Sequence, residues 1–288
     1  MANMETIYRA WISSINDRRW DDVVQYMQPT YAHGSTDMIS LNHQQFTAYH
    51  KHVLEVFGPD CSFTADAVVA DAEAGCIAAR CLAEVTLVQP FLGLQPNGKR
   101  VRFFETQFVW FEDQRVRELR RVPDLDDFRR QMSSRAEETT PDLMGLPLEL
   151  PTSRHLDNAG LKSFYRSYIK AINEDLSESS LSEFCNPSVV HNAKTLSLSQ
   201  YVSLIDDSSS AVREMTAHIH TIVADEKSQR IAARIEWSGE PIKTLAGIDP
   251  NGRSVRFPEH VIYQLEAGKI ARVWAIVDWD SFRAQMTA

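Results

Sequence analysis

Apolar side chains recur at every fourth position in two stretches of the chain, and each stretch predicts an amphipathic helix. The first stretch reads YRAWISSIN and the second reads YRSYIKAIN. The apolar stripes start one residue before these stretches and are Ile7, Trp11 and Ile15 in the first and Phe164, Tyr168 and Ile172 in the second. Because the two stretches share spacing and sequence, we expect them to play the same part in two related folds.

Two further helices are predicted after each stripe. They span residues 20–27 and 43–57 after the first stripe, and 180–184 and 199–207 after the second. Proline cannot continue a helix, so we expect Pro29 and Pro187 to end the shorter helix in each case. Short extended pieces at 31–33 and 189–191 separate the two helices.

The remainder of each half alternates as β-strands do. In the first half the predicted strands are 61–71, 76–88, 100–111 and 114–122. A Pro-Asn-Gly segment at 96–98 is a strong turn signal before the third of these strands. Helices followed by a run of strands indicate an α+β fold, in which helices cover one side of a curved antiparallel or mixed sheet and close a cone.

The strand region is duplicated. The segment IAAR at 77–80 recurs at 231–234, which is 154 positions later, and PNG at 96–98 recurs at the same separation. From Val68 to Met132, 22 of 65 positions are identical to the second copy without a gap. A period this long excludes a solenoid, whose repeats run to ~20–50 residues. The chain is therefore expected to hold two copies of one domain.

A chain of 288 residues has room for two domains of ordinary size. We predict two tandem cone-shaped domains, each with three N-terminal helices on its sheet, at residues 1–132 and 160–288. The segment 133–159 between them contains three prolines and reads as an extended linker. Its apolar part, 143–150, is suited to packing along a domain surface.

Composition excludes several classes of function. The net charge of −9 argues against nucleic-acid binding, and no apolar run approaches the ~18 residues of a membrane span. The N-terminal residues lack a secretory pattern, and the four cysteines form no CxxC pair, so we expect a cytoplasmic protein with reduced thiols. No dinucleotide-binding glycine motif, Walker loop or nucleophile elbow occurs, so we expect no cofactor and no covalent intermediate.

The motifs of the second copy resemble those of the SnoaL-like polyketide cyclases, which belong to the nuclear transport factor 2-like superfamily. The matching residues are Gly247, Pro250-Asn251-Gly252-Arg253, Val255, Gly268-Lys269-Ile270, Trp274 and Asp278. The resemblance covers both copies. It implies the cone fold, but that superfamily includes cyclases, ketosteroid isomerases, dehydratases, epoxide hydrolases and binding modules.

The resemblance also implies roles for particular residues in both copies. SnoaL-like cyclases use an Asp at the end of the last strand as general acid/base, and Asp278 and Asp124 match it. Ketosteroid isomerases carry a Tyr on the first helix, matched by Tyr168, where the first copy has Trp11. Their strand carboxyl corresponds to Glu259 and Glu105, and their base after the second helix corresponds to His191 and His33.

Strand alternation adds a geometric argument. Asp278 and Trp274 share one face of the last strand, whereas Glu259, Phe257 and Tyr263 share a face of its neighbour. A carboxyl among such aromatic neighbours has a raised pKa, as a general acid/base needs near neutral pH. We expect Trp274, Tyr263 and Phe257 to contact the substrate in the second copy, and Trp11 to do so in the first.

Each of these residues also has a purely structural interpretation. Asp278 and Asp124 are placed to cap the helices that follow them. Glu259 and Glu105 are equally compatible with being surface charges. His191 and His33 are equally compatible with ordinary loop positions, and Tyr168 is compatible with a place in the core. His218, His220 and His260 lack ligand counterparts in the first copy, so we expect no metal site. Arg256 falls on the opposite strand face from Glu259, against an epoxide-hydrolase pairing.

Taken together, the sequence favours a cofactor-free acid/base enzyme that cyclises, isomerises or dehydrates a small apolar polyketide- or terpenoid-like metabolite of secondary metabolism. The second copy keeps Tyr168, His191, Glu259, Trp274 and Asp278, so it is the better candidate for catalysis. The alternatives are a non-catalytic binding or dimerisation module, and a hydrolase related to epoxide hydrolases. We expect the copies to pair as an intramolecular pseudo-dimer that is able to form further homo-oligomers, with a small molecule as the other partner.

Overall fold

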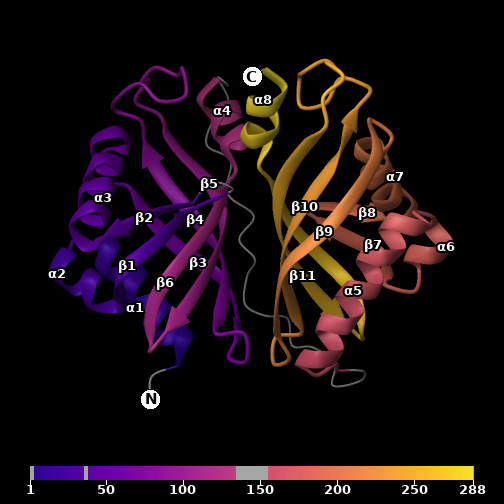
Figure 1. The fold of residues 1–288 in the computed structure, drawn as a ribbon, viewed down its shortest axis with the longest axis horizontal. Coiled ribbons are helices and arrows are strands. Elements are labelled where there is room, and N and C mark those ends of the chain that lie inside the picture. The colour runs from indigo at the N-terminus through magenta and orange to yellow at the C-terminus, as the bar shows by residue number, and fades with distance from the viewer. Residues whose placement is uncertain (1–2, 36–37, 134–154, 288) are drawn as a thin grey trace. The chain divides into compact units, whose positions relative to one another are not determined.

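The structure is a computed structural model that describes residues 3–35, 38–133 and 155–287. The chain divides into two compact units, Met1–Met144 (unit 1) and Gly145–Ala288 (unit 2), which hold the first and second copies (Figure 1). The predicted linker, residues 133–159, lies mostly outside the described residues. The predicted packing of its apolar part falls there entirely.

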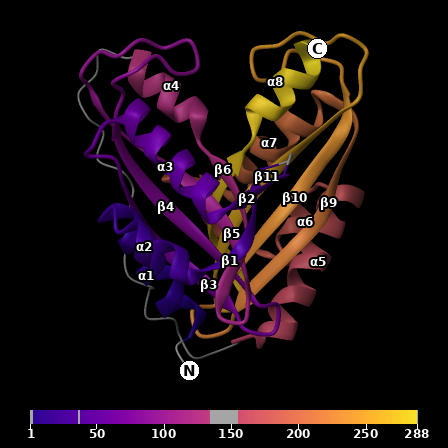
Figure 2. The ribbon, with the colours of Figure 1, turned by 60° about the vertical axis from the view of Figure 1, so that its left-hand side comes forward.

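Unit 1 begins with two helices and a 3₁₀ turn, continues with two strands and a third helix, and ends with four strands and a closing helix. In chain order its elements are α1 (Met4–Asn16), α2 (Trp20–Val23), η1 (Val24–Tyr26), β1 (Met27–Gly34), β2 (Met38–Asn42), α3 (His43–Phe57), β3 (Ser62–Asp71), β4 (Cys76–Thr86), β5 (Arg100–Glu112), β6 (Arg115–Pro123) and α4 (Leu125–Ser133). The sheet order is β2-β1-β6-β5-β4-β3, and of its described strand pairs β1–β6 is parallel and the others are antiparallel. Helices α1 and α3 cover one face of this sheet (Figure 2).

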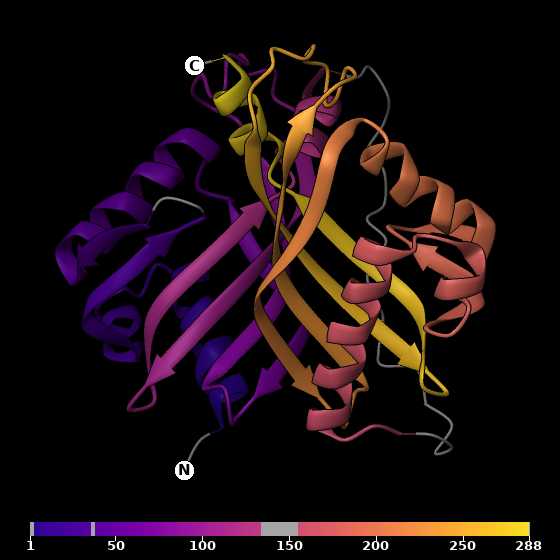
Figure 3. The ribbon, with the colours of Figure 1, turned by 45° about the vertical axis from the view of Figure 1, so that its right-hand side comes forward.

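Unit 2 repeats this topology, with no described counterpart of η1. Its elements are α5 (Asn158–Glu174), α6 (Glu178–Leu181), β7 (Cys185–His191), β8 (Lys194–Ser197), α7 (Leu198–Ser209), β9 (Val212–Asp225), β10 (Arg230–Pro241), β11 (Val255–Glu266), β12 (Lys269–Val277) and α8 (Trp279–Thr287). The order β8-β7-β12-β11-β10-β9 matches unit 1, with β7–β12 as the parallel pair. Helix α5 lies across the strands (Figure 3). The predicted α+β class and the two tandem cone domains are confirmed.

Local sequence explains where the helices begin. Asn42 and Ser197 start α3 and α7 with complete capping boxes. Each side chain accepts from a backbone N–H three residues on, and the side-chain oxygen of the glutamine at that position accepts from the backbone N–H of the capping residue. Asn16 and Asn173 then tie the first helix of each unit to its sheet. Each asparagine bonds both the N–H and the C=O of one strand residue, Phe63 in unit 1 and Ala217 in unit 2.

The Pro-Asn-Gly segment does more than turn the chain. The Asn251 amide donates to the backbone oxygen of Met286 at 2.7 Å, near the end of α8. Gly252 holds a φ of 77°, a left-handed conformation that favours glycine. Asn97 makes the same bond to Met132 in unit 1. The segment therefore fixes the closing helix against one end of each sheet.

Two details of the predicted elements are wrong. Pro29 and Pro187 do not end the short helices, because they lie inside β1 and β7, on strands that begin at Met27 and Cys185. The edge strands β2 and β8 were not predicted, and they extend each sheet by one strand. None of the described helices is both long and apolar enough to pass through a membrane.

Candidate active site

Strand β11 provides the row of side chains that faces the helices of unit 2. Its alternate residues Val255, Phe257, Val261, Tyr263 and Leu265 are all buried in one hydrophobic cluster with side chains of α5 and α7. Glu259 stands in the middle of this row, on the same face because strand side chains alternate. It lies opposite Ile235 of β10 and Val277 of β12 in the sheet register. Sequence alternation therefore placed Glu259 with Phe257 and Tyr263 correctly.

Among the described residues, the Glu259 carboxyl has one side-chain donor, which is neutral, and a largely apolar surrounding. The Trp237 indole Nε1–H donates to its Oε2 at 2.5 Å. Burial raises the pKa of Glu259 to about 6, and the bond from Trp237 opposes that rise only in part. The residue keeps some exposure to solvent. At neutral pH this carboxyl is thus mainly ionised, yet it can accept and return a proton.

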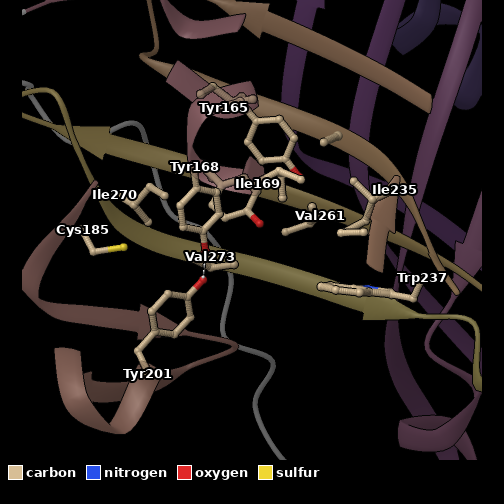
Figure 4. Close-up of a cluster of buried hydrophobic side chains, with 14 of the residues drawn as sticks. Tyr165, Tyr168, Ile169, Cys185, Tyr201, Ile235, Trp237, Val261, Ile270 and Val273 are labelled. Atoms are coloured by element: carbon tan, nitrogen blue, oxygen red, sulfur yellow. Dashed lines mark hydrogen bonds between the residues drawn. The ribbon is translucent and has the colours of Figure 1, made fainter. Parts of the chain in front are cut away.

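Four buried tyrosines surround this row. Tyr165 and Tyr168 come from α5, Tyr201 from α7 and Tyr263 from β11, and all belong to the same cluster. Figure 4 shows the first three of them. The hydroxyls of Tyr168 and Tyr201 are 2.8 Å apart, and the Tyr263 ring centroid lies 5.3 Å from that of Tyr165 and 5.7 Å from that of Tyr168. Burial raises the pKa of each phenol, so all four stay protonated and can donate hydrogen bonds.

His191 marks an opening beside the tyrosines. Its ring centroid lies 5.9 Å from that of Tyr201. It lines a groove of about 460 Å³ between β7, β8 and α7, with Lys194, Gln200 and Leu204 among the other lining residues. Burial and the charge of Lys194 lower the pKa of His191 to about 4, so it is neutral at pH 7. The structure brings His191 to Tyr201, not to Glu259.

Asp278 occupies the N-terminal end of α8. Its carboxylate accepts from the backbone N–H of Ser281 at 2.9 Å, which is the geometry of a helix N-cap. Asp124 does the same for α4 through Asp127, and burial raises its pKa to about 6. Both aspartates therefore have the capping contact that was the alternative to a catalytic role.

The Asp278→Asn substitution distinguishes a capping role of Asp278 from a proton-transfer role. Because Asn caps helices about as well as Asp, Asp278→Asn should keep stability within about 0.5 kcal/mol, whereas Asp278→Ala should lose ~1 kcal/mol. Thermal unfolding of both variants measures the capping term. If Asp278 also moves a proton, Asp278→Asn should lower turnover by ~100-fold or more, and a change below threefold would limit Asp278 to capping.

Trp274 does not join the Glu259 row. It pairs with Ile262 across β11 and β12, so both point to the face opposite that of Tyr263 and Val273. Trp274 is 4% exposed. Phe257 does lie on the inner face, where it packs on Trp279 and Phe282. The structure thus brings Phe257 and Tyr263 together with Glu259 and leaves Trp274 on the other side of the sheet.

The matching carboxyl in unit 1 is bound by charged and amide groups. Arg121 Nη1 lies 3.3 Å from Glu105 Oε2, and the Gln107 amide donates to Glu105 Oε1. The second Arg121 nitrogen, Nη2, donates to the Tyr49 hydroxyl at 2.5 Å. Glu105 is only 1% exposed. Its carboxylate is therefore held inside a network, in contrast to Glu259.

The other predicted residues of unit 1 lie in the same interior. The Tyr31 hydroxyl and His33 Nδ1 are 3.0 Å apart, and burial lowers the pKa of His33 to about 3. The His33 ring lies 5.0 Å from that of Tyr49. Trp11 is 1% exposed and packs between Tyr8 and Phe46. Trp11 is thus a core residue in this structure.

Sequence reasoning missed Tyr165, Tyr201 and Trp237. Tyr165 lies three positions before Tyr168 and so shares its helix face, a spacing that was visible in the sequence. Trp237 reaches Glu259 from the neighbouring strand β10, and Tyr201 reaches Tyr168 from another helix, so neither contact has a local signal.

The histidines set aside as metal ligands have other neighbours. His218 Nε2 lies 3.2 Å from the Ser238 hydroxyl, and His220 Nε2 lies 3.8 Å from the Glu236 carboxylate. Within the ranges that the structure describes, no group of three or more His, Cys, Asp or Glu side chains is placed to hold a metal ion. Arg256 is exposed and faces Glu236 at 3.9 Å, away from Glu259.

Comparison with known proteins identifies one family model. The model for SnoaL-like polyketide cyclases matches residues 5–132 and again residues 162–286. A search of curated proteins returned no match.

Solved structures that resemble the chain each align with a little under half of it. A SnoaL-like polyketide cyclase from Agrobacterium tumefaciens is 29% identical, covers 43% of this chain and 96% of its own, and has a TM-score of 0.41. AclR from Streptomyces galilaeus is 21% identical over 46% of this chain and 98% of its own, with a TM-score of 0.40. TsrD from Streptomyces laurentii is 22% identical, covers 46% of this chain and 97% of its own, and has a TM-score of 0.41.

Proposed function

The chain belongs to the SnoaL-like polyketide cyclase family, and we propose that its second unit performs cofactor-free acid/base chemistry on a small apolar metabolite. The metabolite is a polyketide- or terpenoid-like product of secondary metabolism, and the reaction is a cyclisation, isomerisation or dehydration. The environment of Glu259 carries this proposal. Its raised pKa of about 6 and its partial exposure suit a group that exchanges a proton with a bound ligand.

In the proposed reaction Glu259 acts first as a base. Its carboxylate removes a proton from carbon next to a substrate carbonyl, and the electron pair moves to the carbonyl oxygen. Protonated phenols stabilise that oxygen, because a buried donor strengthens as negative charge develops on its acceptor. The proton held on Glu259 is then returned, either to carbon or to a newly formed alkoxide. Trp237 keeps the carboxyl oriented throughout.

Further roles are proposed for residues at the margin of this site. His191, beside the groove and Tyr201, would bind the polar end of the substrate as a neutral imidazole. Tyr168 and Tyr201 would orient each other through their shared hydrogen bond. A proton-moving role for Asp278 is a separate proposal, and the Asp278→Asn variant described above tests it.

For unit 1 the contacts favour the non-catalytic alternative. Glu105 is paired with Arg121 and bonded by Gln107, so little of its charge is available to a ligand. Carboxylates held in salt bridges are what a binding or structural module predicts. We therefore propose that unit 1 supports the fold and that turnover takes place in unit 2.

The rate of proton abstraction should depend on pH in one direction. Because the base is the ionised form of Glu259, the rate should rise as pH increases through about 6 and level off above it. Deuterium incorporation into candidate ketones in D₂O, followed by NMR between pH 4.5 and 8, measures this directly. His191, with a pKa of about 4, cannot produce that inflection.

Asp124 is the matched control, since its pKa is also raised to about 6. The inflection should persist in Asp124→Asn, because Asp124 belongs to unit 1. A rate that falls with pH in this window, or an inflection that disappears in Asp124→Asn, contradicts the assignment to Glu259.

A further inference from the structure

The first helix of each unit carries a buried tyrosine at the same position. Tyr8 and Tyr165 begin the shared YR segments, and both are 0% exposed. The asparagines eight residues later, Asn16 and Asn173, bond corresponding strand residues. The two tyrosines are therefore equivalent in place as well as in sequence.

Their hydroxyls have opposite surroundings. The Tyr8 hydroxyl donates to Gln107 Oε1 at 2.8 Å and lies 3.0 Å from Cys81 Sγ. The proton of the Tyr165 hydroxyl has no hydrogen-bond acceptor among the described residues. Tyr263 lowers the pKa of Tyr165 as a hydrogen-bond donor to the phenolic oxygen, which leaves the Tyr165 O–H free to donate.

Two substitutions between the copies account for this difference. The positions of Gln107 and Cys81 are occupied in unit 2 by Val261 and Ile235, each 154 residues later. Figure 4 shows the Tyr165 ring turned toward the side of the cluster where Val261 and Ile235 lie. Aliphatic side chains cannot accept the phenolic proton. A buried donor left unpaired is destabilising, so its retention calls for an explanation.

The same two positions also change what surrounds the carboxyl. In unit 1 the Gln107 amide bridges the site, because its oxygen accepts from Tyr8 and its nitrogen donates to Glu105. In unit 2 the amide is absent, and Ala275 stands where unit 1 has Arg121. Tyr165 lies in one buried cluster with Phe257 and Val261, and Glu259 stands between these two residues on the same face of β11, so phenol and carboxyl share one interior. The charge of Glu259 accordingly raises the pKa of Tyr165. In unit 2 the Tyr165 hydroxyl is thus a donor and the Glu259 carboxylate an acceptor, without the amide that connects the equivalent groups in unit 1.

We infer that Tyr165 binds the substrate's carbonyl oxygen, and that the substrate's O=C–C–H unit takes the place of the Gln107 amide O=C–N–H. In that pose the carbonyl accepts from Tyr165 while the adjacent C–H faces Glu259. The C–H bond breaks, its proton goes to the Glu259 carboxylate, and the electron pair forms an enolate whose oxygen is held by the Tyr165 hydroxyl. The substrate class is therefore a neutral, apolar ketone with an enolisable carbon.

This inference rests on the proposed function for the role of Glu259, but its test does not require turnover. The probes are 2-naphthamide, which carries the same amide as Gln107, and 2-ethylnaphthalene, which has similar apolar bulk without oxygen or nitrogen. Isothermal titration of the whole chain should show 2-naphthamide binding at least ~10-fold more tightly, since the amide pairs a donor and an acceptor that are otherwise buried.

Two variants test whether Tyr165 causes the preference for 2-naphthamide over 2-ethylnaphthalene. The ratio of the two affinities should fall to less than ~3-fold in Tyr165→Phe, which lacks the donor, and in Val261→Gln, which supplies the amide from the chain itself. Tyr8→Phe, the matched change in unit 1, should leave it intact. A preference that survives in Tyr165→Phe, or no binding of 2-naphthamide to the unaltered protein, overturns the inference.

Stability of the ligand-free protein gives a second, independent reading. Tyr165→Phe should leave the melting temperature unchanged or raise it, because it removes an unpaired buried hydroxyl, whereas Tyr8→Phe should lower it by several degrees. Equal losses in both variants would show that Tyr165 has a structural partner, against the inference. If both readings hold but Glu259→Gln still turns over substrate, the proposed function fails while the oxygen-binding site stands.

Discussion

Glu259→Gln should lower turnover by ~100-fold or more while the fold remains intact. The glutamine keeps the size of the side chain and can still accept from Trp237, so the main loss is the ability to take up and release a proton. The rate constant for deuterium exchange or for product formation measures the effect. Substrate affinity should change far less than the rate, because the carboxyl acts mostly in the transition state.

The duplicated chain supplies the control for this variant. Glu105→Gln makes the same chemical change at the equivalent place in unit 1, where the carboxyl is already bound by Arg121 and Gln107. It should leave turnover within about threefold of the unaltered protein. Equal losses in the two variants would mean that both units carry out the reaction, or that neither carboxyl acts directly in it.

Arg121→Leu should destabilise unit 1 by roughly 3 kcal/mol. The substitution leaves the Glu105 carboxylate buried without its opposite charge, and breaking such a pair costs about 3–5 kcal/mol when both partners are buried. The lower figure applies because the Arg121 side chain retains 26% exposure, against 2% for Glu105. Hydrogen exchange of β5 and β6 should accelerate ~100-fold, since exchange of protected strands reports the opening free energy.

A second substitution in the same network gives the control. In Arg121→Leu/Glu105→Gln the buried charge is gone, and the new amide can still accept from Gln107. Most of the lost stability should return, since removing both charges is far less costly than removing one. If the double variant is as unstable as Arg121→Leu, the loss comes from packing around Arg121 and not from an unpaired carboxylate.

Periodic patterns predicted most of the fold. The stripes of Ile7 and Phe164 fall on α1 and α5, and His43–Phe57 is a helix over the predicted range. The duplication made the second half of the topology follow from the first. The short strands β2 and β8 escaped prediction because MISLN and KTLS are too brief and too mixed to show alternation. Their pairing comes from the neighbouring strands β1 and β7.

The site was predicted less completely. Alternation grouped Glu259 with Phe257 and Tyr263, but it could not say that the face of Trp274 points away from the helices of unit 2. Deciding between the two faces requires the packing of α5 and α7. The network around Glu105 was likewise invisible, because Tyr8 and Tyr49 approach it from helices far away in sequence.

The comparison between the units suggests how a duplicated fold separates two tasks. In unit 1 the interior polar groups satisfy one another, as Tyr8, Gln107, Glu105 and Arg121 do. In unit 2 two of the corresponding positions, Val261 and Ala275, are aliphatic, and within the described ranges Trp237 is the one side chain that donates to Glu259. Networks whose members are all satisfied stabilise a fold, whereas unsatisfied groups are available to a ligand.

The ionisation of Glu259 tests the central claim most directly. Infrared difference spectra of the unaltered protein minus Glu259→Gln, recorded from pH 4 to 8, isolate the band of its protonated carboxyl without any substrate. The band should titrate with a midpoint of about 6, because burial raises the pKa of Glu259 above its usual value. A midpoint near ~4.3, the value of an exposed glutamate, would contradict an acid/base role for Glu259 in unit 2.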